Sequence, residues 1–247
     1  MSSLKIFFLF SLMMLSFNRQ IESKFISCLR DFEFLKACQK NLVNYFEILG
    51  GKKYEYRPIP IFNLQRNKPA FKKHLLEIKN NNGFIEDQNN YKDMSYGVKP
   101  LSDNGSSLIA LYNALKHLTK KYIDLPYLIK IFESSGIIMS GLFGTSMKSI
   151  EEYLTKNGFS YKSSMNKEDY EEIGKTTDAC ILTIYNNVSN ILKAVQFIAI
   201  TKENEKYYIH NYGTDSYKIA YNSMKDVLER IFSGNVWNIY LTGIHKK

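Results

Sequence analysis

Several residue types that common protein sites depend on are scarce in this sequence. Its 247 residues include four histidines, three cysteines and one tryptophan. The histidines and cysteines do not recur at the spacings of a zinc site, which needs about four such ligands close together. We therefore expect neither a metal nor another cofactor.

The sequence also lacks an apolar run long enough to cross a membrane. The run from Ile6 to Phe17 is too short, because a spanning helix needs about 20 apolar residues. Lys5 precedes the run, and Ile21-Glu22-Ser23 offers cleavage after the small residue Ser23, which is the pattern of a secretory signal peptide. We expect residues 1–23 to be removed and the remaining chain to be secreted, without integral membrane contact; an uncleaved anchor is the alternative.

Secretion permits disulfides, but the three cysteines do not define a bridge. Cys28 and Cys38 both lie in the N-terminal segment. One straight helix would hold them about 15 Å apart, too far for a bond, so a bridge requires a break between them. This pairing stays open. Cys180 lies in an apolar strand pattern, which predicts a buried core thiol.

Basic residues exceed acidic ones and give a net charge of +9. The lysines are dispersed along the chain, and no cluster alternates with aromatic residues as a nucleic-acid groove requires. We expect no nucleic-acid partner. Attraction to an acidic surface or glycan stays open.

The first third of the chain differs in pattern from the rest. Apolar residues recur at helical spacing over 25–49, and prolines favour an extended stretch over Arg57–Pro60. Pro69 is expected to open a short helix that ends at Ile78. We predict that residues 24–90 form a helical and extended segment, either a prosegment or a wrap around the main domain.

Residues 91–247 are predicted to form the principal domain, with helices first and strands afterwards. This order argues for an α+β fold with an antiparallel sheet. The turn Glu203–Glu205 joins two strands as a hairpin. Helices are expected over 106–118, from Asp124 to Gly136, over 146–157 and over 223–232; strands are expected over 179–185, 194–201, 206–211, 217–221 and 236–242.

The most informative stretch is Ser102–Leu115, where a glycine turn opens into a helix. Backbone N–H groups and the positive end of the helix dipole meet at such a turn, so a thiol placed there ionises easily. In this chain the residue at the helix mouth is Ser106.

Four segments of the domain resemble the papain-like cysteine peptidases of the bacteriocin-leader-processing, or double-glycine, type. The nucleophile helix of that family resembles Gly-Cys-x-x-Ile-Ala-x-x-Asn-Ala-Leu, and this chain has Gly105-Ser-Ser-Leu-Ile-Ala-Leu-Tyr-Asn-Ala-Leu115. A glycine-rich segment follows at Gly141–Ser146. The family's His-x-Val-Ala-Ile strand is matched by Gln196-Phe-Ile-Ala-Ile200, and its second hairpin strand by Tyr207-Tyr-Ile-His-Asn211.

The resemblance implies a papain-like fold and places three site residues. The nucleophile position is Ser106 instead of cysteine, and the general-base position is Gln196 instead of histidine. The orienting position is Asn211, which is compatible with the family. The family's oxyanion-hole glutamine has no counterpart in Val98–Ser102, where Pro100 stands.

These replacements predict loss of peptidase activity. A serine hydroxyl needs an adjacent base to attack, and the amide of Gln196 cannot take up a proton near neutral pH. His210 neighbours Asn211 on the same strand, so alternation turns it away from Ser106, and a surface or packing role is expected for it. We therefore expect a catalytically inactive homologue, a pseudopeptidase, that binds a peptide or protein in the former cleft.

Two alternatives stay open, so the sequence favours a protein without enzymatic activity but does not decide the question. One is an active hydrolase that uses Ser106 as nucleophile with a base not yet located; the other is a secreted basic protein that binds an anionic surface. Asn104 and Asn187 begin sequons, so either is a candidate for a glycan. The sequence does not predict the substrate, the partner or the oligomeric state.

Overall fold

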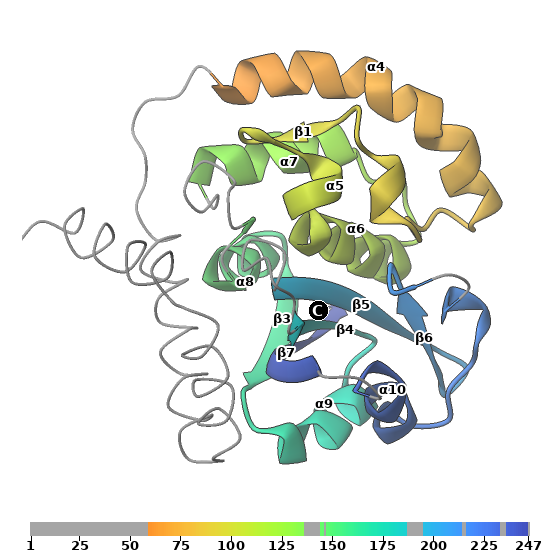
Figure 1. Ribbon diagram of the computed structural model, residues 1–247. Helices are drawn as coiled ribbons and strands as arrows, with labels where there is room; N and C mark the ends of the chain where they lie inside the picture. The colour runs from red at the N-terminus through yellow and green to blue at the C-terminus, as the bar shows by residue number, and fades with distance from the viewer. Residues whose placement is uncertain are drawn as a thin grey trace, which may run out of the picture. The chain divides into compact units, whose positions relative to one another are not determined.

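The computed structural model describes residues 59–135, 144–145, 147–186, 195–213, 216–232 and 236–246 (Figure 1). All of them belong to one compact unit, Val43–Lys247. The predicted signal peptide, the predicted helix over 25–49, Cys28, Cys38 and Asn187 lie outside the described residues. The boundary predicted between residues 90 and 91 stays a prediction.

A five-stranded antiparallel sheet organises the domain, with strand order β3-β7-β4-β5-β6. Its central strands form because apolar residues run almost continuously there and are covered on both faces. The predicted hairpin is confirmed: Glu203 pairs with Lys206, and the two residues between them have φ of 50° and 59°. The strands are β3 (Phe159–Ser164), β4 (Ala179–Asn186), β5 (Val195–Glu203), β6 (Lys206–His210) and β7 (Val236–Lys246).

Helices cover the sheet on both faces, so the predicted α+β class is confirmed (Figure 1). On one face α9 (Tyr170–Thr176) and α10 (Met224–Ile231) bury an apolar core. Cys180 belongs to this core, as predicted, and burial raises the pKa of its thiol to about 11. On the other face α6 (Ser106–Thr119) packs against β5 and β4.

Beyond α6 lies a further helical layer (Figure 1). Helix α4 (Ile59–Asn80) packs against α7 (Leu125–Ser135). The prediction of a short helix from Pro69 to Ile78 is wrong in its bounds, because α4 begins at Ile59 and contains Pro69. The prediction of an extended stretch over Arg57–Pro60 is wrong for Ile59 and Pro60, which belong to the helix. Tertiary packing of the buried face offsets the lost backbone hydrogen bond of the proline. The smaller elements are η1 (Gln88–Asn90), β1 (Ser95–Tyr96), β2 (Lys99–Pro100), α5 (Leu101–Asn104), α8 (Met147–Lys156) and η3 (Lys167–Asp169).

Local signals fixed several helix ends correctly. The Asp124 carboxylate accepts the N–H of Tyr127 at the start of α7. Ser223 and Asp226 form a reciprocal capping box at the start of α10. Gly158, with φ of 78°, follows α8 and lets the chain turn into β3.

One expected strand is absent, and several elements were not predicted, among them β3 and α9. Residues 217–221 do not form a strand; η5 (Ser216–Lys218) is followed by a single antiparallel bridge between Tyr207 and Tyr221. Strand β3 and helix α9 were not predicted because each has exposed polar residues, which weaken the periodic pattern of apolar residues. Among the described helices, none has both the length and the apolar content that a membrane crossing requires.

Candidate functional site

Ser106 is the first residue of α6, as the sequence predicted. The turn before it requires glycine, because a Cβ on Gly105 would lie 2.5 Å from the carbonyl oxygen of Leu101. The carbonyl of Gly105 accepts the N–H of Ile109 at 3.0 Å and so starts the helix. Only 8% of Ser106 is exposed. The hydroxyl therefore sits at a helix N-terminus inside the domain.

The Ser106 hydroxyl reaches the start of β5. Its Oγ accepts the backbone N–H of Phe197 at 3.3 Å. Strand β6 pairs with β5 only from Ala199 to Glu203, so Phe197 lies beyond the end of β6. The hydroxyl thus takes the place of a neighbouring strand and satisfies a sheet-edge donor. It also brings the nucleophile position next to the backbone of the base position.

Gln196 precedes Phe197 on β5 and pairs with Ile184 of β4. Its side chain is half-buried. The structure therefore brings Ser106 and Gln196 into one neighbourhood through the chain at Phe197, although 90 residues separate them in sequence. Neither a hydroxyl nor a carboxamide is a base near neutral pH, so this pair has no group that could accept the nucleophile's proton.

Asn211 lies directly after β6, in the left-handed conformation with φ of 58°. Its Oδ1 accepts the backbone N–H of Gln88 at 2.8 Å, and its Nδ2 donates to Gln88 Oε1 at 3.3 Å. Both ends of the amide are thus bound to one residue. These bonds tie Asn211 to Gln88, not to Gln196.

Gln88 is the residue that sequence analysis missed at this site. Its Nε2 donates to the carbonyl oxygens of Leu101 and Ser102, at 3.3 and 2.8 Å. Gln88 therefore connects Asn211, at the sheet, with the turn that precedes Ser106. Because both hydrogens of Nε2 are used in this way, the side chain is not an oxyanion donor in this conformation. The only local signal was the polar run 87–90, outside the window where a glutamine was expected.

Gln88 ends a segment, Gly83–Gln88, that we call the strap. Asn113 of α6 holds its middle by two bonds: Oδ1 accepts the N–H of Ile85, and Nδ2 donates to the carbonyl of Ile85, both at 2.8 Å. The Tyr112 hydroxyl donates to the carbonyl of Gly83 at 3.2 Å. The strap therefore runs beside α6, fixed by side chains that satisfy its backbone.

A buried chain of polar groups attaches the strap to β6. Glu86 Oε1 lies 2.7 Å from His210 Nδ1, and His210 Nε2 lies 2.8 Å from the hydroxyl of Thr201. The second oxygen of Glu86 accepts the N–H of Asn211 at 3.2 Å. Phe84 stacks on the imidazole, with ring centroids 4.2 Å apart.

Glu86, His210 and Thr201 follow one another as carboxylate, imidazole and hydroxyl, which is the order of functional groups in a catalytic triad. The three residues are at most 8% exposed, so a substrate cannot reach Thr201 in this conformation. Of the surface and packing roles expected for His210, the structure shows packing, because only 3% of the residue is exposed. The group stabilises the strap and does not form a second reactive centre.

A buried carboxylate holds the upper helical layer together. Glu133 Oε1 of α7 accepts the N–H of Gly97 at 2.7 Å and Asn63 Nδ2 at 2.5 Å. Burial raises the pKa of Glu133 to about 7, against the lowering effect of these two bonds. The carboxyl group therefore links α4, the β1–β2 turn and α7.

The sequon residue Asn104 is buried, and its Nδ2 donates to the carbonyl of Tyr96 at 2.9 Å. A glycan on this nitrogen would have to displace that bond in the folded domain. Glycosylation stays a prediction, which this geometry disfavours at Asn104.

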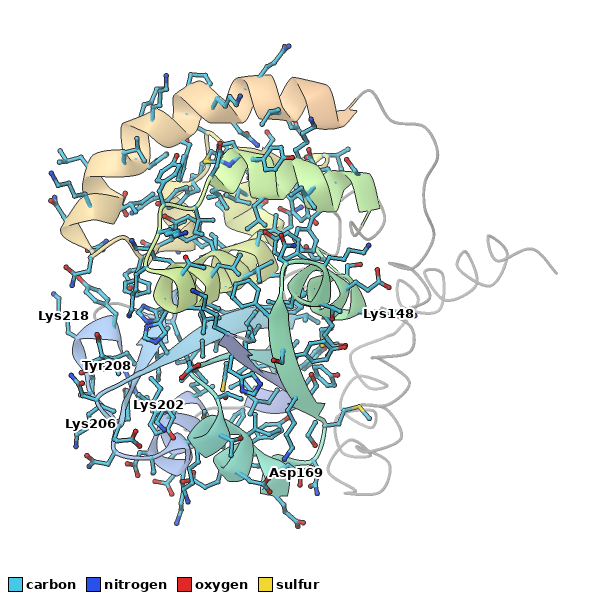
Figure 2. All side chains as sticks on the ribbon, turned by 180° about the vertical axis from the view of Figure 1, so that it is seen from behind. Lys148, Asp169, Lys202, Lys206, Tyr208 and Lys218 are labelled. Atoms are coloured by element: carbon cyan, nitrogen blue, oxygen red, sulfur yellow. The ribbon has the colours of Figure 1, made fainter. Side chains whose placement is uncertain are left out.

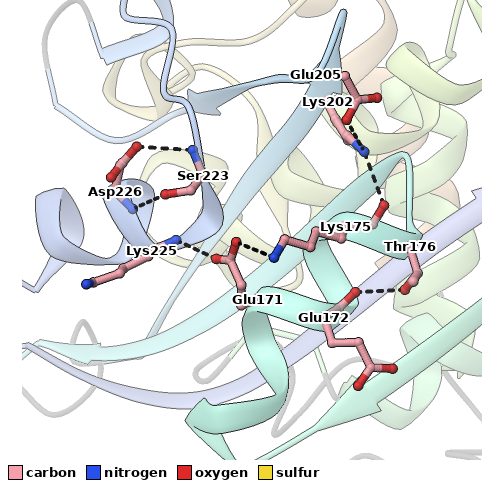
Figure 3. A network of polar contacts seen from close by, with 9 residues as sticks. All are labelled: Glu171, Glu172, Lys175, Thr176, Lys202, Glu205, Ser223, Lys225 and Asp226. Atoms are coloured by element: carbon pink, nitrogen blue, oxygen red, sulfur yellow. Dashed lines mark hydrogen bonds and ion pairs between the residues drawn. The ribbon is translucent and has the colours of Figure 1, made fainter.

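A surface hollow of about 650 Å³ lies away from Ser106, between the η3–α9 region and α10. Figure 3 shows the polar contacts beside it: Glu171 binds Lys175 Nζ at 3.4 Å and accepts the N–H of Lys225 at 2.9 Å. Its lining mixes both charges with Leu228 and Phe232, so it has no preference for an anion. Within the described part of the chain, no three His, Cys, Asp or Glu residues are grouped to hold a metal ion.

Comparison with known proteins found a similarity in fold to solved structures. No family model matches the chain, and no curated protein matches it. Among solved structures it resembles a peptidase domain, that of Streptococcus ComA, a bi-functional ABC transporter involved in a quorum-sensing pathway. The identity is 16%, the TM-score is 0.40, and the match covers 62% of this chain and all of the other. At this identity the likeness concerns the fold alone.

Proposed function

We propose that this chain is a secreted, catalytically inactive homologue of papain-like cysteine peptidases that serves as a peptide- or protein-binding module. One observation carries the proposal: the Ser106 hydroxyl accepts a backbone hydrogen bond from Phe197 at 3.3 Å, at the mouth of α6. The side chain at the nucleophile position thus acts as a connector between helix and sheet.

The neighbouring positions support the same conclusion. Gln196 carries no group that exchanges protons near neutral pH, and both ends of the Asn211 amide are bound to Gln88. Nucleophile, base and orienting residue therefore cannot act as a unit. What such a site can still supply is binding and weak electrostatic stabilisation.

Hydrolysis of a broad peptide library tests the loss of activity. The wild-type chain is compared with Ser106→Ala and with Ser107→Ala, a matched change at the next helix position. We expect the three proteins to give the same background rate. Robust hydrolysis that only Ser106→Ala abolishes, with covalent labelling of Ser106 by a fluorophosphonate probe, would instead establish the active serine hydrolase.

Peptide display followed by affinity measurement tests the binding role. Gln196→Arg adds a positive charge beside Ser106, in the candidate cleft, and Glu229→Arg reverses a charge in the hollow beside α10. We expect a selected peptide to lose at least about tenfold in affinity with Gln196→Arg and to tolerate Glu229→Arg. The reverse order would move the binding site to the hollow and contradict the proposal.

A further inference from the structure

Helix α4 presents a fixed outward surface. On its inner side Asn67 exchanges two bonds with the backbone of Ser95, at 2.7 and 2.8 Å. His74 stacks on Tyr91 with centroids 4.4 Å apart, and its Nε2 lies 2.8 Å from Asp93 Oδ1. These contacts, with the Asn63–Glu133 bond, prevent the helix from rotating about its axis. Within the described part of the chain, the opposite side is exposed.

That exposed side, which we call the outer face of α4, carries charge of one sign. It has five cations and no acidic residue; the one acidic residue of the helix, Glu77, is half-buried and accepts a bond from Asn90 at 2.9 Å. Within the described residues, ion pairing on this face is confined to Lys73, whose Nζ lies 4.0 Å from Asp93 Oδ2. The face consists of Gln65, Arg66, Lys68, Pro69, Lys72, Lys73, Leu75, Leu76, Lys79 and Asn80.

Large apolar side chains are exposed among these cations. Leu76 is 70% exposed and Leu75 is 37% exposed. Leu76 stands four residues after Lys72 and three before Lys79, so helical spacing places it between them on the same side. Tyr122, 65% exposed, adds an aromatic ring next to the helix, 6.5 Å from the ring of Phe71.

We propose that the outer face of α4 binds an anionic lipid surface. Lysine side chains are attracted to acidic headgroups, each contributing at short range, and their flexible stems let leucines approach the acyl chains. Exposed leucines and a tyrosine gain from insertion at a membrane interface. They gain little on a polyanion such as nucleic acid or a sulfated glycan, which offers no apolar interior. This inference is independent of the proposed peptidase-like function.

Vesicle co-sedimentation of the full chain tests the proposal. One set of vesicles contains phosphatidylcholine alone, and the other contains about 30 mol % phosphatidylserine. Any contribution of the apolar run Ile6–Phe17 is common to both sets and to every variant. We expect the serine lipid to strengthen binding at about 0.05 M salt, and the gain to vanish at about 0.5 M, where charges are screened.

Two variants of the face and one control separate the contributions. Lys68→Gln, Lys72→Gln and Lys79→Gln together should weaken binding to acidic vesicles about a hundredfold. Leu76→Gln alone should weaken it about tenfold and leave the salt dependence unchanged. The control changes Lys148, Lys206 and Lys218 to Gln, which removes the same charge from α8, β6 and η5 (Figure 2). Circular dichroism and thermal unfolding confirm that each variant is folded.

Three outcomes would overturn the proposal. The first is equal binding to both kinds of vesicle by the wild-type chain. The second is a loss in the control triple variant as large as that in the α4 triple variant, which would show a dependence on net charge alone. The third is an unchanged affinity in Leu76→Gln together with equal or tighter binding to heparin, which would make the face a general polyanion site.

Discussion

The two faces of the central sheet are held by different kinds of contact. On the α9–α10 face a cluster of apolar side chains fills the space, and charged contacts such as Glu171–Lys175 lie at the surface (Figure 3). On the α6 face the strap is fastened by buried polar groups, among them Asn113, Glu86 and His210. The α9–α10 face is stabilised mainly by burial of apolar area, whereas the α6 face combines the apolar packing of α6 with specific hydrogen bonds to the strap.

This difference sets how each face responds to substitution. Apolar packing loses free energy in proportion to the volume removed. A buried polar pair loses more when one partner is removed, because the other is left without a bond. The candidate site lies on the second kind of face, so its residues are constrained by structure even without catalysis.

The largest effect is expected where the strap meets β6. Glu86→Ala leaves His210 Nδ1 and the N–H of Asn211 without their buried acceptor, and should lower the free energy of unfolding by about 4 kcal/mol. Urea unfolding measures this loss. Thr201→Val removes one bond of the same chain and should cost about 1 kcal/mol. Equal losses in the two variants would contradict the central role of Glu86.

On the opposite face, a core truncation should cost somewhat less. Leu182→Ala removes a fully buried side chain from β4 and should lower the free energy of unfolding by about 3 kcal/mol. Ile219→Ala is the control, since Ile219 is 46% exposed, and it should cost under about 0.5 kcal/mol. A loss in Leu182→Ala below that in Thr201→Val would reverse the comparison between the faces.

The helical layer above α6 should show a pH dependence that comes from Glu133. Its pKa is about 7 in the folded state and about 4.5 when unfolded, so the folded state prefers the protonated form. The stabilisation is complete below about pH 4.5 and is lost as the pH rises through 7, by up to about 3 kcal/mol. Glu133→Gln removes this dependence.

Urea unfolding of the wild-type chain and Glu133→Gln at about pH 5 and pH 8 measures that effect. Glu133→Gln should be more stable than the wild-type chain at pH 8, and the difference in the free energy of unfolding should be smaller at pH 5. Glu152→Gln, at an exposed position of α8, should show no comparable change. If the stability difference between Glu133→Gln and the wild-type chain became smaller as the pH rises, its pH dependence would have the wrong sign. Glu133 would then not be the source of the pH dependence.

The smallest effect is expected in the surface network beside α10. Lys175→Ala breaks the ion pair with Glu171. The side chain of Lys175 is 66% exposed and that of Glu171 is 35% exposed. Solvent screens such pairs, so the free energy of unfolding should fall by less than about 0.5 kcal/mol, and high salt should erase the difference. A loss above about 1 kcal/mol would show that Figure 3 depicts a structural network and not a solvated surface.

The fold was predictable where local pattern and tertiary structure agree. The start of α6 at Ser106, the hairpin of β5 and β6, and the helix expected over 223–232 follow from glycine and turn residues and apolar spacing within a few positions. The pattern failed for α4, where Pro69 lies inside a helix. There the packed inner side outweighs the local preference.

The partners within the site could not be read from the chain. Asn211 was predicted as the last residue of a strand, but it lies directly after β6 in the left-handed conformation, and its partner Gln88 lies 123 residues earlier. The same holds for Glu86 and His210, 124 residues apart. A carboxamide or carboxylate in a polar run has no local signature of its distant partner.

The sequence by itself determined the α+β class, the approximate positions of α6, α7, α8, α10 and the strands β4 to β7, and the position of Ser106 at a helix mouth, because turns, caps and apolar periodicity act over a few residues. Only the tertiary structure decided what these side chains bind. It directed the Ser106 hydroxyl to the N–H of Phe197, the Asn211 amide to Gln88, and the cations of α4 to one outer face. The physical reason is that hydrogen-bond partners and surface charge are set by the approach of distant segments, which burial of the whole apolar core brings about.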